Sequence, residues 1–125
     1  MTLKPPPPRF KLSGIASKIL SAFVYWHKIV RNIPKIHRYS LGLNIEKLFA
    51  DLVQLVATAQ FSPKEKRPNL ISEAISKNDV LKFTLYALWE LEGIQESHFL
   101  ELAPRLEEIG RMLYGWLQKM ISESK

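Results

Sequence analysis

The sequence contains no cysteine. This absence excludes disulfide bonds, thiolate metal sites and thiol nucleophiles together. No apolar run approaches the roughly 18 residues that a membrane-spanning helix needs, so we expect no contact with a membrane. The beginning of the chain also lacks the charged region and the cleavage site of a signal peptide, because prolines occupy residues 5–8. A cytoplasmic location is therefore expected.

Patterns that carry catalytic chemistry are missing as well. The three histidines, His27, His37 and His98, are far apart and none lies in a metal-binding spacing. Neighbouring carboxylates such as Glu107 and Glu108 are adjacent, whereas two groups on one face of a helix lie three or four residues apart. No glycine-rich phosphate loop and no nucleophile elbow occurs. We expect no enzymatic activity, no cofactor and no metal ion.

Apolar residues recur at steps of three and four along four stretches, which is the pattern of amphipathic helices. No stretch alternates with a period of two, so no strand is predicted. Short connections make neighbouring helices antiparallel. The sequence thus predicts an all-α fold, an up-down-up-down antiparallel four-helix bundle over residues 13–125, after a flexible proline-rich tail at 1–12. The expected helices cover residues 13–32, 38–60, 70–92 and 98–122, with a corner at 33–43 and a basic loop at 61–69.

The third expected helix has apolar residues on more than one side, and Gly93 is expected to end it. One apolar side must face the bundle, so the other favours contact with a second copy of the chain. For Trp89, a place in the core and a place in an interface are both open. The residues assigned to an oligomer interface are Leu81, Leu85, Tyr86 and Trp89.

The net charge of +6 is unevenly distributed. Residues 1–82 hold 14 Lys and Arg against 5 acids, whereas residues 83–125 hold 4 against 7, which gives +9 and −3. Such asymmetry indicates either a polyanionic partner or an unevenly charged solvated surface.

The basic residues gather on the first helix, at the corner and in the loop, and in a bundle the corner and the loop lie at opposite ends. They could follow a phosphate backbone without reading its sequence. His37 and Tyr39 could stack on an unpaired base; alternatively, Tyr39 covers the core and His37 is solvated. The predicted nucleic-acid contacts are Lys18, Lys28, Arg31, Lys35, His37, Arg38, Lys64, Lys66 and Arg67.

Several short motifs resemble a known family of four-helix bundles, which includes proteins encoded in intervening sequences of bacterial large-subunit rRNA genes. The first motifs are Ile33-Pro34-Lys35 and Arg38-Tyr39-x-Leu41-Gly42. The later ones resemble the accessory variability determinant (Avd) proteins of diversity-generating retroelements: Leu88-x-x-Leu91-x-Gly93-Ile94-Gln95 and Ile109-Gly110-Arg111-x-Leu113-x-Gly115-Trp116-Leu117. Together the resemblance covers about residues 13–121.

The resemblance implies a homopentamer of four-helix bundles with a basic surface that binds RNA and DNA. It also implies association with the reverse transcriptase of the element, which copies template RNA into mutagenised cDNA. The accessory protein itself is not the polymerase. Because Lys77 and Lys82 are the only basic residues of the third helix, we place nucleic-acid binding on the first helix, the corner and the basic loop. The alternative is an oligomeric protein-interaction module, similar to the intervening-sequence proteins, without a role in a retroelement.

Overall fold

A computed structural model describes residues 13–123, and within them the chain is helical with no strand, which confirms the all-α prediction. The predicted flexible tail at 1–12 lies outside the described residues. None of the helices in the described part is both long enough and apolar enough to cross a lipid bilayer. The long helices are α1 (Gly14–Ile29), α3 (Leu41–Phe61), α4 (Arg67–Glu90) and α5 (Glu96–Glu123), and the short ones are η1 (Val30–Asn32), α2 (Lys35–Arg38) and η2 (Lys64–Lys66).

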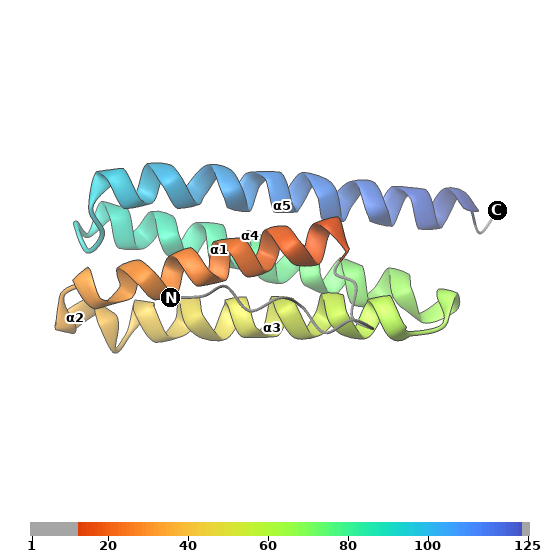
Figure 1. Ribbon diagram of the computed structural model, residues 1–125, viewed down its shortest axis with the longest axis horizontal. Coiled ribbons are helices and arrows are strands. Elements are labelled where there is room, and N and C mark those ends of the chain that lie inside the picture. Colours follow the sequence, from red (N-terminus) through yellow and green to blue (C-terminus); the bar gives the residue numbers. More distant parts are fainter. Residues whose placement is uncertain (1–12, 124–125) are drawn as a thin grey trace, which may run out of the picture.

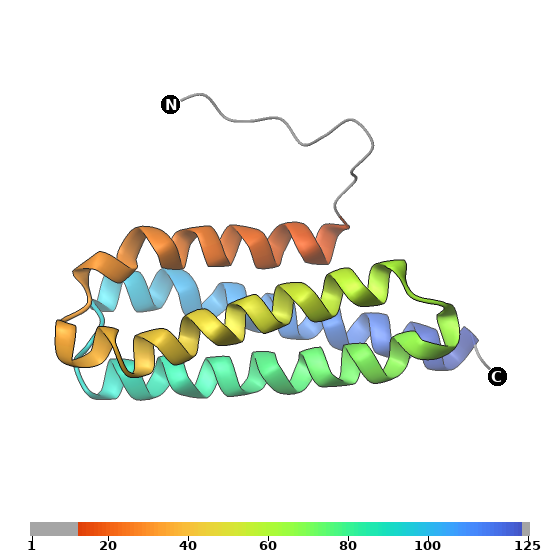
Figure 2. The same cartoon turned by 90° about the horizontal axis from the view of Figure 1, so that it is seen from below.

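The four long helices lie side by side, and each runs opposite to the next along the chain (Figure 1). α1 packs against α3 and α5, and α4 packs against the same two helices from the other side. Both views show that α1 starts well short of the end where α3 connects to α4 (Figure 2). At that end the last turns of α5 and the first turn of α4 extend beyond α1. A pocket lies between them, because α1 does not cover this end.

The core is built from the apolar stripes that the sequence predicts. Trp26 and Phe49 are its largest side chains, and both are fully buried. Complete burial of a Leu or Phe side chain contributes about 1.5–3 kcal/mol, so the packed stripes supply most of the force that holds the helices together. The stripes contribute Ile19, Ala22, Trp26 and Ile29 from α1, Ile45, Phe49, Leu52 and Val56 from α3, Ile71, Leu81, Leu85 and Leu88 from α4, and Leu102, Leu106, Ile109 and Leu113 from α5.

The corner between α1 and α3 is fastened by Arg38. Its guanidinium donates hydrogen bonds of 3.1 and 2.9 Å to the carbonyl of Ile33 and one of 2.8 Å to the carbonyl of Arg31. Pro34 has no N–H and interrupts the helix there, so these carbonyls lack helical partners. The expected corner therefore contains the extra helical turn α2, and α3 begins at Leu41 instead of residue 38.

Two prolines lie inside helices, and one of them, Pro68, lies where the sequence predicts a loop. Pro68 occupies the first turn of α4, so the helix begins at Arg67 and the expected loop is shorter. Proline is tolerated there because the N–H groups of a first turn have no helical acceptor. Pro104 lies within α5, which starts at Glu96 and runs without a break. Its ring leaves the carbonyl of Leu100 without its usual donor, and the exposure of Leu100 leaves this side of the helix open to solvent.

The end of α4 also differs from the expectation that Gly93 terminates it. The left-handed residue is Glu92, with φ of 58°. The N–H of Glu92 donates to the carbonyl of Trp89, and the N–H of Gly93 donates to the carbonyl of Leu88. These two bonds form a Schellman motif in which Glu92 takes the position that glycine usually holds. Gly93 serves close packing instead, because a Cβ there would lie 2.9 Å from Cδ2 of His37.

Candidate nucleic-acid interface

Some of the cations are already neutralised by carboxylates. Lys18 lies 3.0 Å from Glu108, and Lys82 lies within reach of two acids. Surface ion pairs of this kind contribute only about 0–1 kcal/mol, but a paired cation has less charge to offer a phosphate. The paired cations of the described residues are Lys18, Lys47, Lys77, Lys82 and Arg105. The predicted contact Lys18 therefore belongs to the paired set.

The cations of residues 13–123 that lie in no ion pair gather mainly at the two ends of the bundle. Lys28, Arg31 and Lys35, here called the corner cations, are exposed at the end where α1 turns into α3. Lys64 and Lys66 are exposed in η2 at the other end, beside Arg67 and near Lys119. The corner and the loop were predicted to lie at opposite ends, and the views agree with that placement (Figure 1).

A shallow hollow of about 380 Å³ lies beside two of the corner cations. Lys28 and Arg31 form its rim, and Phe23 and Val24 are among its apolar residues. The ring of Phe23 is held by a stack on Phe49, with ring centroids 5.1 Å apart. Nearby His27 lies 3.0 Å from Glu46. This part of α1 offers two free charges over a rigid apolar surface.

His37 and Arg38, which were predicted to contact nucleic acid, are instead engaged within the chain. Arg38 is half-buried and holds the corner carbonyls. The ring of His37 is half-buried against Gly93 in the turn between α4 and α5. Tyr39 does not cover the core, since 64% of it is exposed, and the Arg38 guanidinium lies 6.0 Å from its ring centroid. The alternative that Tyr39 covers the core is therefore wrong, whereas His37 remains partly exposed to solvent.

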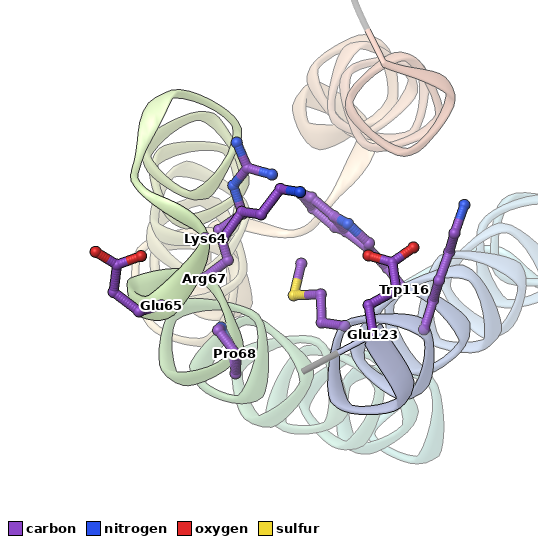
Figure 3. A pocket seen from close by; sticks show the side chains of 8 residues that line it. Lys64, Glu65, Arg67, Pro68, Trp116 and Glu123 are labelled. Carbon is purple, nitrogen blue, oxygen red and sulfur yellow. The ribbon is translucent and has the colours of Figure 1, made fainter. Parts of the chain in front are cut away.

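A larger pocket, here called the end pocket, lies where α1 leaves the far end of the bundle uncovered. Its volume is about 680 Å³ (Figure 3). Its residues are Lys64, Glu65, Arg67, Pro68, Trp116, Lys119, Met120 and Glu123. The sequence predicted Lys64 and Arg67 as nucleic-acid contacts but did not predict that residues from α5 lie beside them. Their spacing of three, four and seven, together with the antiparallel order, could have placed them beside the basic loop.

Arg67 is anchored rather than free. Its Nε donates a 3.0 Å hydrogen bond to the carbonyl of Ser62, which joins the end of α3 to the start of α4. The anchored guanidinium keeps its charge at the rim of the end pocket. Lys64 extends from η2 across the pocket, and Glu65 points away from it (Figure 3).

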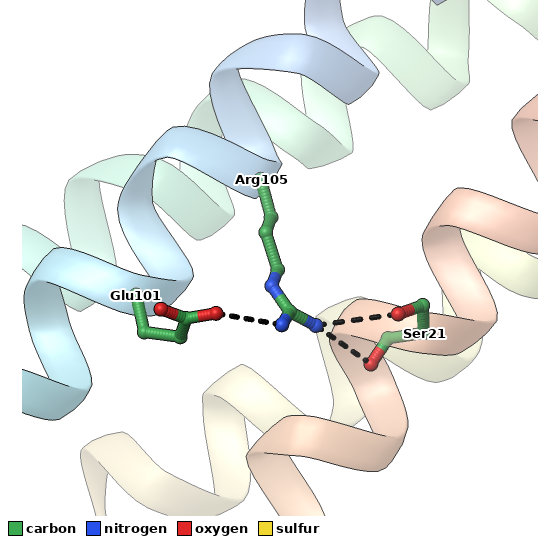
Figure 4. A network of polar contacts seen from close by, with 3 residues as sticks. All are labelled: Ser21, Glu101 and Arg105. Atoms are coloured by element: carbon green, nitrogen blue, oxygen red, sulfur yellow. Dashed lines mark hydrogen bonds and ion pairs between the residues drawn. The ribbon is translucent and has the colours of Figure 1, made fainter.

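A polar network ties α1 to α5 and removes Arg105 from the free charges. Arg105 lies 2.8 Å from Glu101 and donates to Oγ of Ser21 at 3.2 Å (Figure 4). Its guanidinium also lies 5.0 Å from the ring centroid of Tyr25. Burial, and then the charge of Glu101, raise the pKa of Tyr25, while Arg105 opposes this rise. The network is a structural link between the two helices.

The residues assigned to an oligomer interface divide between the inside and the outside of the chain. Leu81 and Leu85 are buried in the core of this chain, at 0% and 1% exposure, so they have no surface to offer a second copy. Tyr86 is exposed, and Trp89 is half-buried in a stack on Phe99 with centroids 5.2 Å apart. The outward apolar side of α4 consists of Val80, Phe83 and Tyr86.

The periodicity of α4 could not decide which side faces in, because both sides are apolar. In the structure Leu81, Leu85 and Leu88 lie in the core of the chain. The assignment of Leu81 and Leu85 to an oligomer interface is therefore wrong. Phe83, with 78% of its surface exposed, lies on the outward side of α4 and was not in the assignment.

Fold and surface together define a small all-helical protein whose free cations lie at both ends of packed antiparallel helices. A model of the bAvd-like family matches residues 15–120. The chain therefore belongs to the bAvd-like family, which confirms the resemblance found in its motifs. No curated protein and no solved structure was found to match it.

Proposed function

We propose that this chain is a non-catalytic accessory protein of a diversity-generating retroelement. It binds RNA or DNA through its free cations and associates with the reverse transcriptase of the element in the cytoplasm. Membership of the bAvd-like family is the observation that carries this proposal. The free corner cations and the free cations of η2 support it, because a phosphate backbone needs unpaired positive charge at several points.

Duplex DNA binding at several salt concentrations tests the proposal. The affinity should fall steeply with salt, because each neutralised phosphate releases counterions. Replacing Lys28, Arg31 and Lys35 with glutamine should weaken binding and make the slope of log affinity against log salt less negative by about 2.7, at about 0.9 for each phosphate that is no longer neutralised.

A matched control replaces the paired residues Lys47, Lys77 and Lys82 with glutamine. It removes the same net charge from cations that lie in ion pairs with carboxylates, so its salt slope should change less. Equal decreases of affinity in both triple variants would contradict a role for the corner cations. Failure of the unaltered chain to bind RNA or DNA at low salt would refute nucleic-acid binding altogether.

We further propose that copies of the chain assemble into a homopentamer through the outward side of α4. Three large apolar side chains support this: Val80, Phe83 and Tyr86 are exposed by 51%, 78% and 52%. Exposed apolar surface of this kind favours association. The mass of the protein in solution tests the assembly, and Phe83→Ser should lower it, whereas Thr84→Ser on the same helix should not.

The second candidate is an oligomeric module that binds proteins only. The same apolar side of α4 favours it, together with the acidic residues Glu90, Glu92 and Glu96 that line a hollow with Trp89 and Ile94. Assembly without any affinity for nucleic acid would select this candidate. Retention of the reverse transcriptase of the same element on immobilised protein would select the first.

A further inference from the structure

The end pocket combines features that contacts to a phosphate backbone alone do not require. Phosphates need only the cations at its rim, yet the pocket also contains Trp116 and Met120. We propose that the end pocket binds one unpaired nucleotide of a single-stranded nucleic acid, with its base on Trp116 and its phosphate between Lys64, Arg67 and Lys119. This inference rests on the proposed function and adds a specific site to it.

The size and the lining of the end pocket suit a nucleotide. A volume of about 680 Å³ lies within the roughly 300–1,000 Å³ typical of pockets that bind small molecules. Trp116 is half-buried and packs against the core, so its ring is held in place before a ligand arrives. Stacking on an ordered aromatic ring accepts any base, because every base presents a π-face.

Charge within the end pocket favours a phosphate at one side. Lys64 and Lys119 are exposed and lie in no ion pair with a carboxylate of residues 13–123. Arg67 is the first residue of α4, and the amino end of this 24-residue helix adds a partial positive charge there. Glu65 points away, and the carboxylate of Glu123 offsets only one of the three positive charges, so the pocket keeps a net positive charge (Figure 3).

Glu123 supplies a preference among bases. It lines the end pocket from the last turn of α5, and its carboxylate points into the pocket (Figure 3). An ionised carboxylate can only accept hydrogen bonds. It therefore favours cytosine, whose N4 amino group donates, over uracil, which presents a carbonyl at the same position.

Three RNA octamers with equal backbone charge test the site on the full chain: oligocytidine, oligouridine and an abasic strand. The oligocytidine should bind about 5- to 150-fold more tightly than the abasic strand, which is the range for stacking one base. Trp116→Leu keeps an apolar side chain against the core and should bring this ratio close to one. Tyr114→Ala removes an exposed aromatic from the same helix outside the pocket and should leave the ratio unchanged.

Tryptophan fluorescence provides a readout that does not depend on removing Trp116. In a Trp89→Phe background the remaining tryptophans are Trp116 and the fully buried Trp26. Base-containing octamers should quench the fluorescence, whereas the abasic octamer should not. Glu123→Gln should abolish the preference for oligocytidine over oligouridine, because an amide both donates and accepts.

The outcomes separate this inference from the proposed function. Equal, salt-dependent affinities for all three octamers, without quenching, would overturn the nucleotide site and leave phosphate binding intact; the end pocket would then suit a partner protein. Absence of binding by every octamer and by duplex DNA at low salt would overturn both.

Discussion

Replacing Gly93 with alanine tests the packing of the turn that joins α4 to α5. An added Cβ would lie 2.5 Å from Cδ1 of Leu88 and 2.9 Å from Cδ2 of His37. Leu88 is fully buried and has no solvent into which it could move, and His37 is itself half-buried. Overpacking of this kind costs about 1–3 kcal/mol. We therefore expect Gly93→Ala to lower the free energy of unfolding by about that amount.

Gly115→Ala is the matched control for this prediction. Gly115 lies within α5, is exposed, and an added Cβ there would have nothing within 4 Å. Alanine in the interior of a helix is favoured over glycine by about 0.5–1 kcal/mol, so this variant should be more stable than the unaltered chain.

The measurement is a urea titration followed by circular dichroism at one fixed protein concentration, because self-association would shift the apparent stability. The two glycine variants should move in opposite directions. If Gly93→Ala were neutral or stabilising, the close contact between the corner and the turn would not exist as described.

Four further predictions concern single side chains, each measured by the same titration. Glu92→Gly should stabilise by about 1 kcal/mol, since glycine adopts a left-handed conformation without penalty; a decrease in stability would contradict the Schellman geometry. Asn78→Leu should be neutral or stabilising, because the buried Oδ1 of Asn78 has no partner in the described residues; a destabilisation above about 2 kcal/mol would show that its bond to Leu106 matters more. Arg38→Lys should destabilise by about 1–2 kcal/mol because lysine lacks the guanidinium fork, whereas a decrease of nucleic-acid affinity alone would assign Arg38 to binding. The pKa of Tyr25 is raised above 10.0 in the folded chain, so its contribution to the free energy of unfolding is fully present below pH 10 and is lost as the pH rises through the folded pKa. Tyr25→Phe should therefore reduce the loss of stability at alkaline pH.

Local periodicity was sufficient for most of the helical boundaries. Steps of three and four place Ile19, Ala22 and Trp26 on one face of α1, and the structure buries all three. The errors occurred at the starts of α3, α4 and α5 and at the end of α4. Pro68 fits the first turn of α4, so the helix begins before this proline instead of after it, whereas Pro104 lies inside α5 as the predicted range of 98–122 has it. A proline inside a helix leaves the carbonyl four residues earlier without its donor, and the helix tolerates this where that carbonyl faces solvent. The direction of the carbonyl cannot be predicted from the sequence.

The candidate site was predictable only in part. The sequence identified the basic stretches that contain Lys28, Arg31 and Lys64, and these side chains are exposed and unpaired among residues 13–123. It could not identify Lys18 as paired, because Glu108 lies 90 positions away and reaches it only through the contact of α1 with α5. Nor could it show that Arg38 donates to the carbonyls of Arg31 and Ile33, or that His37 lies half-buried beside Gly93.

The sequence by itself determined an all-helical chain, the approximate extent of its helices and the uneven distribution of charge, because these properties depend on residue type and on neighbours within one or two turns. Tertiary structure alone decided which side of α4 faces outward, which cations lie in no ion pair within residues 13–123, and that Trp116 and Lys64 line one pocket. Each of these depends on atoms that the fold brings together from helices distant in the sequence. Because α1 begins short of the end where α3 connects to α4, the end pocket remains open there.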